Sequence, residues 1–266
     1  MTAPRLCIAT PIDGMPDSAK CAFGYARALA QILSARDTEV QMMPPAALGY
    51  PADLVRARSR VVNYAHEVDA THVLWLDDDN VIKPGALASM LASGHDIIGC
   101  PYPRKQLHWK RVGRASAFEE PEWHAYNYAY HFAPGDGGQK NVTVTDGCIP
   151  VARMSMGCML TTVRALDAIV DHFREADWFT DVSVEGKSTP CVAIFGLLMS
   201  MIYEVDGRPF RALYSEDYSF CERYNVMRDN RPDLGFGPIQ MLVSHPADHV
   251  GGHLFRGSAE GIAYGR

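Results

Sequence analysis

Short apolar segments alternate with amphipathic ones through the first 100 residues of the chain. Strands are expected at 6–9, 40–43, 72–76 and 95–100, and helices at 19–35, at 53–68 and from Pro84 onward. In the second helix, apolar side chains recur at steps of three and four after Asp53, a residue type that favours the N-cap. This alternation predicts the α/β class, with an open, mostly parallel central sheet flanked by helices. Ligands of such sheets bind beyond the carboxyl ends of the strands.

Three consecutive carboxylates, Asp77, Asp78 and Asp79, follow the apolar strand expected at 72–76. Neighbouring anions repel one another and add nothing to a core, whereas a bound divalent cation would offset their repulsion. The plain alternative is a solvated turn, because Asp and Asn favour turns and helix starts. The triplet therefore predicts either a metal site at the strand end or a polar turn.

Two later segments carry side chains suited to catalysis or metal binding. Ser215 is the expected N-cap of a helix, which places Glu216 and Asp217 in its first turn. Acids at that position also suit the helix dipole without any catalytic role. Three histidines close to a Gly-rich tail are candidate ligands, although a single terminal histidine is more often structural: His245, His249 and His253.

The alternation breaks down between residues 101 and 150, where a small β insert is expected, and resumes with a strand at 154–161 and a helix at 163–173. The insert begins with a basic stretch that also holds His108 and Trp109. Its charged residues are Arg104, Lys105, Lys110, Arg111 and Arg114. The stretch is either a solvated loop face or a contact for phosphate, from a diphosphate or from a nucleic-acid backbone.

Composition narrows the class of protein. The net charge of −6 argues against the whole surface binding nucleic acid, although the basic stretch could do so locally. Seven scattered cysteines without a Cys-x-x-Cys motif predict reduced, mostly buried thiols. The chain has no apolar run of the roughly 18 residues that span a bilayer, and it does not begin like a secretion signal. We therefore expect a cytoplasmic protein that does not enter the membrane.

Taken together and in order, these features resemble the GT-A-fold glycosyltransferases, particularly the family 2-like enzymes of bacteria and phages. The resemblance rests on residues 57–60, 77–79, 97–105, 156–160, 215–218 and 249–251. It implies one GT-A (Rossmann-like) domain over residues 1–266. Residues 1–105 would form the nucleotide-sugar-binding half, and residues 106–266 the acceptor-binding and catalytic half.

The resemblance also implies an activity: a metal-dependent transfer of a sugar from a nucleotide-diphosphate sugar, with a UDP-sugar as the expected donor, to an acceptor hydroxyl. The implied ligands of Mn²⁺, or of Mg²⁺, are Asp77, Asp79 and His249. The implied catalytic base is Asp217, with Glu216 positioning substrate. The implied donor contacts are Thr10, Pro11 and Asp13 at the nucleobase, and Arg58, Asp77, Asp78 and Lys105 at the remainder of the donor.

Transfer of a sugar from a nucleotide-diphosphate sugar requires the same residue types on chemical grounds alone. A divalent ion stabilises the charge that develops on a departing diphosphate, and a carboxylate takes the proton of the attacking hydroxyl. The acceptor stays open between a hydroxymethylated pyrimidine in phage DNA, a glycan and a small molecule, and so does inversion against retention.

Three other classes of protein share parts of this sequence pattern. A dehalogenase-like phosphatase places its Asp-x-Asp near the amino terminus, and a nucleotidylyltransferase needs a Gly-rich first loop with an arginine, unlike residues 11–14. The third class, a non-catalytic nucleotide- or sugar-binding module on a transferase scaffold, remains the alternative.

Overall fold

The structure is a computed structural model of the 266-residue chain. It describes residues 3–11, 41–42, 46–48, 54–107, 126–128, 130–132, 143–175, 178–182, 188–199, 203–205, 208–211, 213–250 and 254–258. The helix expected at 19–35 and the N-cap expected at Asp53 lie outside these ranges.

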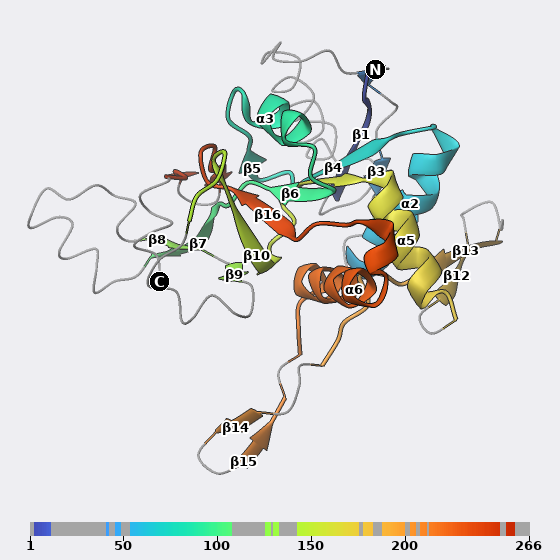
Figure 1. The fold of residues 1–266 in the computed structure, drawn as a ribbon. Helices are drawn as coiled ribbons and strands as arrows, with labels where there is room; N and C mark the ends of the chain where they lie inside the picture. The colour runs from blue at the N-terminus through green and yellow to red at the C-terminus, as the bar shows by residue number, and fades with distance from the viewer. Residues whose placement is uncertain are drawn as a thin grey trace, which may run out of the picture.

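A nine-stranded mixed sheet forms the centre of the molecule (Figure 1). In spatial order its strands are β2 (Gln41–Met42), β1 (Arg5–Pro11), β4 (His72–Leu76), β11 (Cys158–Thr162), β6 (Ile97–Gly99), β16 (Ile239–Leu242), β10 (Cys148–Met154) and β9 (Tyr130–Phe132), with β3 (Ala46–Leu48) also paired to β1. The α/β class is as predicted, and β1 runs parallel to β2, β3 and β4. The other half differs from the mostly parallel sheet that was expected, because β11 runs antiparallel to both of its neighbours and β10 to both of its own.

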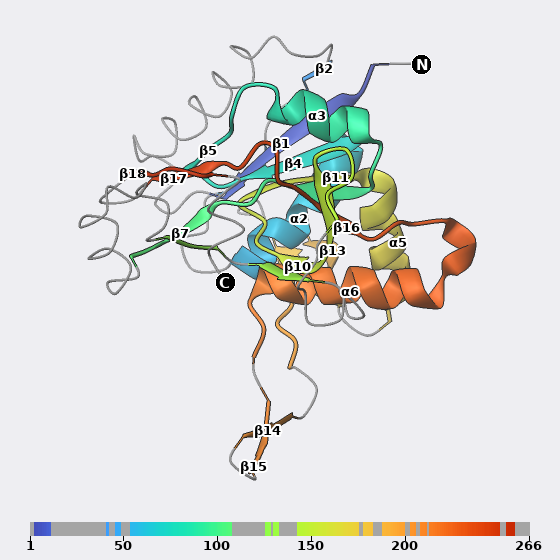
Figure 2. The same ribbon diagram turned by 60° about the vertical axis from the view of Figure 1, so that its left-hand side comes forward.

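Helices cover both faces of the sheet. They are α2 (Leu54–Glu67), α3 (Ala86–Ser93), α5 (Val163–Phe173) and α6 (Glu216–Asn230), followed by the short 3-10 helix η2 (Pro232–Leu234). In Figures 1 and 2, α3 lies on one side of the sheet, and α2, α5 and α6 lie on the other. The predicted helices at 53–68 and 163–173 are confirmed, and the one expected from Pro84 begins two residues later, at Ala86.

The two faces of each central strand enter different parts of the core. On β4, Val73 and Trp75 pack with α2, α5 and α6, whereas Leu74 and Leu76 pack with α3. Successive side chains of a strand point to opposite faces, so a strand that is covered on both sides must be apolar throughout. That requirement explains the unbroken apolar run that precedes Asp77.

The strand predicted at 154–161 is two strands. β10 ends at Met154 and β11 begins at Cys158, and the link between them contains Gly157. This break brings the backbone of Gly157 to the end of β4, where the Asp77 amide donates to the Gly157 carbonyl over 3.0 Å. Apolar periodicity could not reveal the break, because Met154 and Met156 are both buried.

Four smaller sheets surround the central one. They are β5 (Asn80–Val81) with β17 (Asp248–Val250) and β18 (Leu254–Phe255); β7 (Pro103–Leu107) with β8 (Tyr126–Tyr128); β12 (Trp178–Val182) with β13 (Ser188–Val192); and β14 (Tyr203–Val205) with β15 (Arg208–Phe210). The pair β7–β8 accounts for part of the predicted β insert, while β9 joins the central sheet. The β14–β15 hairpin projects away from the body in both ribbon views (Figures 1 and 2).

Two predictions from composition can be compared with the structure. Six cysteines lie within the described residues, and all six are buried and outside any disulfide; Cys21 lies outside those residues. Within the described part of the chain, no helix combines the length and the apolar character needed to cross a bilayer.

Candidate active site

The predicted site lies where β4 ends and α6 begins. The register of the parallel pair β1–β4, with Ala9 opposite Trp75, puts the carboxyl ends of both strands at the same edge of the sheet. Asp77 follows β4 directly. At the start of α6, the Ser215 hydroxyl accepts a hydrogen bond from the Tyr218 amide over 3.4 Å, which confirms the predicted N-cap. The cap fixes where Glu216 and Asp217 leave the helix.

Arg58 joins these elements into one cluster. Its side chain is 3% exposed, and its Nη2 donates to Asp77 Oδ1 over 3.1 Å. Its Nη1 lies 3.4 Å from Glu216 Oε1 and also donates to Asp217 Oδ1. A guanidinium has five donors in a rigid fork, so a single arginine can hold several carboxylates. The acidic turn after β4 and the acidic first turn of α6 thus meet at one buried cation.

The charges of this cluster do not balance. Three carboxylates face one guanidinium, and burial disfavours the charged form of each acid. Burial raises the pKa of Asp77 to about 6 even though Arg58 works in the opposite direction, and the nearby Asp217 raises it further. Burial and Asp217 also raise the pKa of Glu216. Burial would lower the pKa of Arg58, but the three carboxylates outweigh it and the net shift is upward. The cluster has room, electrostatically, for more positive charge.

Asp79 forms a second group with Lys105 and His249. The Lys105 ammonium donates to Asp79 Oδ2, and His249 Nε2 lies 3.4 Å from Asp79 Oδ1. Burial would raise the pKa of Asp79, but the neighbouring His249 and Lys105 lower it below the usual value.

The tautomer of His249 follows from its other ring nitrogen. Nδ1 lies 2.7 Å from the carbonyl oxygen of Pro103. A carbonyl can only accept, so Nδ1 carries the proton. In the neutral ring, Nε2 therefore presents a lone pair toward the carboxylate of Asp79. Two acceptors at this separation are held together either by a proton on Nε2 or by a cation, and a backbone carbonyl on the far nitrogen is the usual support of a metal-binding histidine.

Strand pairing brings His249 to the acidic turn. β17 runs antiparallel to β5, with His249 opposite Asn80. The Val250 amide donates to the Asp79 carbonyl over 2.7 Å, and the Ala247 amide donates to the Pro101 carbonyl over 2.9 Å. The structure places two of the three candidate histidines. His249 lies at Asp79, whereas His245 lies beside Gly85, and His253 is outside the described residues.

Gly157 and Tyr102 belong to the site although no role was predicted for either residue. The Gly157 amide donates to the Tyr102 hydroxyl over 2.9 Å, and the Tyr102 ring meets the His249 ring edge-on at 5.1 Å. Burial raises the pKa of Tyr102 well above its usual value, and Asp77 adds to that shift. A Cβ on Gly157 would lie 2.6 Å or less from side-chain atoms of Asn80, Tyr102 and Asp77. In the sequence, Tyr102 and Gly157 lie in segments on which the resemblance rests, 97–105 and 156–160.

The remaining predicted residues are placed as follows. Thr10 lies at the end of β1, is 1% exposed, and its hydroxyl has no hydrogen-bond partner within the described residues. Pro11 is the last residue of β1 and Asp78 lies in the acidic turn, while Asp13 is outside the described residues. Arg58 and Lys105, predicted as donor contacts, are engaged with carboxylates of the site.

The basic stretch is described only at its beginning. Arg104 and Lys105 lie on β7. Lys105 pairs with Asp79, and Arg104 opposes the rise that burial causes in the pKa of Tyr218. Lys110, Arg111 and Arg114 lie outside the described residues.

The fit to a metal ion can be judged from these side chains. Among the described residues, no group of three His, Cys, Asp or Glu side chains is gathered closely enough to hold a metal. Of the predicted ligands, Asp79 and His249 face each other, while Asp77 Oδ1 is turned to Arg58. The pair offers one oxygen and one imidazole nitrogen, donors that suit Mn²⁺, and water or phosphate oxygens commonly complete such a sphere. The residues fit a metal held together with a ligand better than one held by protein alone.

Comparison of the sequence with protein-family models and with curated proteins gives no match.

Proposed function

We propose that the protein is a metal-dependent glycosyltransferase of the GT-A fold, which moves a sugar from a nucleotide-diphosphate sugar to an acceptor hydroxyl. The observation that carries the proposal is the Arg58 bridge. It joins Asp77, at the end of a central strand, to Asp217, in the first turn of α6. A metal-binding turn and a base are needed within reach of one anomeric carbon, and the bridge supports that arrangement.

In this proposal, Asp79 and His249 hold Mn²⁺ or Mg²⁺ together with the donor's diphosphate. The bound ion supplies Lewis-acid stabilisation of the departing diphosphate. Lys105 pairs with Asp79, and in this proposal its ammonium pairs with a phosphate oxygen of the bound donor. Thr10, at the end of β1, has a buried hydroxyl suited to the nucleoside, and Asp77 and Asp78 complete the donor side.

Asp217 is proposed as the base. Arg58 holds Oδ1 of this carboxylate, which orients the group and leaves Oδ2 to take the proton of the acceptor hydroxyl. Glu216 contacts the same guanidinium and would position substrate. If the base lies in line with the anomeric carbon, the product is inverted. The anomeric configuration of the product, read by NMR, tests this step.

The alternative is a non-catalytic nucleotide- or sugar-binding module. It is favoured by one observation, namely that Asp217 is already engaged by Arg58, since an arginine at a carboxylate stabilises the ionised form and weakens it as a base. Turnover separates the two functions, because a binder has none to lose.

The first experiment is a thermal-shift screen of nucleoside diphosphates and their sugars, with and without Mn²⁺. A ligand that binds only the folded state at 100 times its Kd adds about 2.7 kcal/mol to stability, so a true donor gives a clear shift. We expect stabilisation that depends on the metal and is confined to one nucleobase. Absence of any shift at millimolar ligand would contradict donor binding altogether.

The second experiment measures release of nucleoside diphosphate by Asp217→Asn and by a matched control, Asp229→Asn. Asp229 is an exposed aspartate at the other end of α6, paired only at the surface with Arg228. Loss of a base costs about 10²- to 10⁴-fold in rate, so Asp217→Asn should bind the donor like the wild type and release little product. Asp229→Asn should bind the donor and release nucleoside diphosphate like the wild type. Unchanged turnover in Asp217→Asn would remove the base from the proposal.

The acceptor is tested with duplex DNA that contains hydroxymethylated pyrimidine. Binding through the basic stretch predicts an affinity that falls steeply with salt. Lys110→Gln with Arg111→Gln should weaken that binding and reduce the salt dependence. Lys105 is engaged with Asp79, so it is expected to contribute less. Binding that is absent or insensitive to salt would direct the search to a glycan or a small molecule.

A further inference from the structure

A cavity separate from the acid cluster opens between α2, α5 and β13. Its volume is about 560 Å³, within the range of small-molecule sites. None of the proposed catalytic, donor or metal residues lines it. On α2 the chain turns from Arg58, which faces the carboxylates, to Ser59 and Asn63, which face this cavity.

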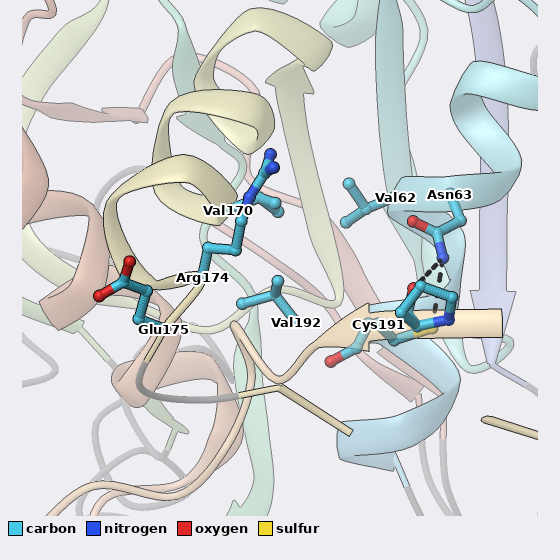
Figure 3. Close-up of a pocket in the computed structure, with 9 residues that line it drawn as sticks. Val62, Asn63, Val170, Arg174, Glu175, Cys191 and Val192 are labelled. Carbon is cyan, nitrogen blue, oxygen red and sulfur yellow. Dashed lines mark hydrogen bonds between the residues drawn. The ribbon is translucent and has the colours of Figure 1, made fainter. Parts of the chain in front are cut away.

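The walls of the cavity are apolar on three sides. Val62 contributes from α2, Val170 from α5 and Val192 from β13, and Figure 3 shows the three side chains around one space. Val62 is almost fully buried, whereas Val170 and Val192 are half-buried. A ligand that covers these half-buried valines removes apolar area from water, which favours binding.

Asn63 brings a polar group to this apolar space. Asn63 Nδ2 donates to the Pro190 carbonyl over 2.9 Å and lies 3.3 Å from Cys191 Sγ. The carbonyl can only accept, so these contacts fix which end of the amide is nitrogen. The amide oxygen is turned toward the cavity (Figure 3), and nothing within the described residues donates to it. The cavity thus presents a fixed hydrogen-bond acceptor.

Neither of the two charged residues at the rim favours an ion in the cavity. Arg174 donates to Asp171 over 2.5 Å, and Glu175 points away from the space (Figure 3). An anion would have to displace Asp171, and a cation would find no carboxylate turned toward it. Burying an unpaired charge against valine costs several kcal/mol, so an ion is a poor occupant.

We propose that this cavity is a binding site for a small, uncharged, mostly apolar molecule that carries one hydrogen-bond donor. The apolar body packs between the three valines, and the donor, a hydroxyl or an N–H, bonds to Asn63 Oδ1. The proposal is independent of the glycosyltransferase reading, because it uses neither the acid cluster nor a nucleotide.

Three probes with the same ring test the ligand class by equilibrium dialysis. 2-Naphthol carries the donor, 2-methylnaphthalene lacks it, and 2-naphthoate replaces it with a negative charge. A neutral hydrogen bond corresponds to about a two- to tenfold difference in Kd, so 2-naphthol should bind tighter than 2-methylnaphthalene by that factor, and 2-naphthoate weakest. No binding of 2-naphthol overturns the site, and equal or tighter binding of either other probe overturns the ligand class.

Two variants and one spectrum test the location. Val170→Trp and Val192→Trp fill the cavity from opposite walls, and each should weaken 2-naphthol binding at least tenfold. Val226→Trp, at a residue that is 44% exposed on α6, is the matched control and should bind like the wild type. In the wild type, NOEs should join the naphthol protons to the methyl groups of Val62, Val170 and Val192. Contacts to other methyl groups, or binding retained by a folded filling variant, would place the ligand elsewhere.

Discussion

Gly157→Ala is the change that most directly tests the geometry of the site. A Cβ at this position would lie 2.4 Å from Asn80 Nδ2, 2.5 Å from Tyr102 Oη and 2.6 Å from Asp77 Oδ2. Real Cβ contacts are not this short, so all three side chains must move by most of an ångström. Because they are held within the cluster around the acidic turn, no single rotation relieves the overlap.

The cost can be worked from two contributions. Overpacking of a well-filled site costs about 1–3 kcal/mol. Moving Tyr102 also weakens the hydrogen bond that its hydroxyl accepts from the Gly157 amide, which adds about 1 kcal/mol. We therefore expect Gly157→Ala to lower the free energy of unfolding by about 2–4 kcal/mol.

Urea denaturation followed by tryptophan fluorescence measures this loss, since Trp75 is buried in the core. Gly237→Ala is the matched control. No atom lies within 4 Å of its Cβ position and its backbone is not left-handed, so the change should be neutral or slightly stabilising. A loss of less than about 0.5 kcal/mol in Gly157→Ala, with an unchanged m-value, would refute the close packing of Gly157 against the acidic turn.

Three further predictions concern single side chains. Arg58→Met should lower the free energy of unfolding by about 3 kcal/mol in urea melts, because it leaves the half-buried carboxylates of Asp77 and Asp217 without their cation. An unchanged midpoint would mean that the carboxylates find other partners. Ser215→Ala should cost about 1 kcal/mol in the same assay through the lost N-cap, and a negligible change would show that the 3.4 Å cap contributes nothing. Burial lowers the pKa of His72 below 6.5, against a smaller opposite effect of Asp96. As the pH falls through about 6.5, His72 therefore takes up a proton more readily in the unfolded chain than in the folded one, and the free energy of unfolding decreases. His72→Gln should flatten that fall relative to the wild type between about pH 7 and 5 in pH-dependent melts, and parallel curves would contradict it.

Local signals predicted the elements that carry the site. The helix at 163–173 is predicted with its observed bounds, and the structure shows Thr162 as its N-cap. The same holds for the start of α6, where Ser215 caps the helix. Asp77 was placed at a strand end because the preceding run is apolar on both faces. Each of these predictions depends on residues within one or two turns of each other.

The contacts between these elements could not be predicted in the same way. Arg58 reads in the sequence as one arginine among several on an amphipathic helix, and Arg56 and Arg60 of the same helix point outward or are only half-buried. Only the packing of α2 against the sheet shows that the Arg58 side chain faces inward. The antiparallel halves of the sheet were missed for a related reason, since buried strands of either direction are apolar throughout.

The position of His249 shows how the fold can build a site from distant segments. The two residues of β5 that follow the acidic turn pair with β17, and this short ladder sets His249 opposite Asn80 and beside Asp79. The Pro103 carbonyl then fixes the ring with its Nε2 toward the carboxylate. On the other side of the turn, Arg58 faces three half-buried acids. Asp79 pairs with the Lys105 ammonium and lies beside His249, and the neighbouring cluster holds three carboxylates against one guanidinium. An imidazole beside a carboxylate and unbalanced negative charge both favour a cation at this side of the turn. The tautomer of one ring and the charge balance of one cluster are independent observations, and together they argue that the acidic triplet is more than a polar turn.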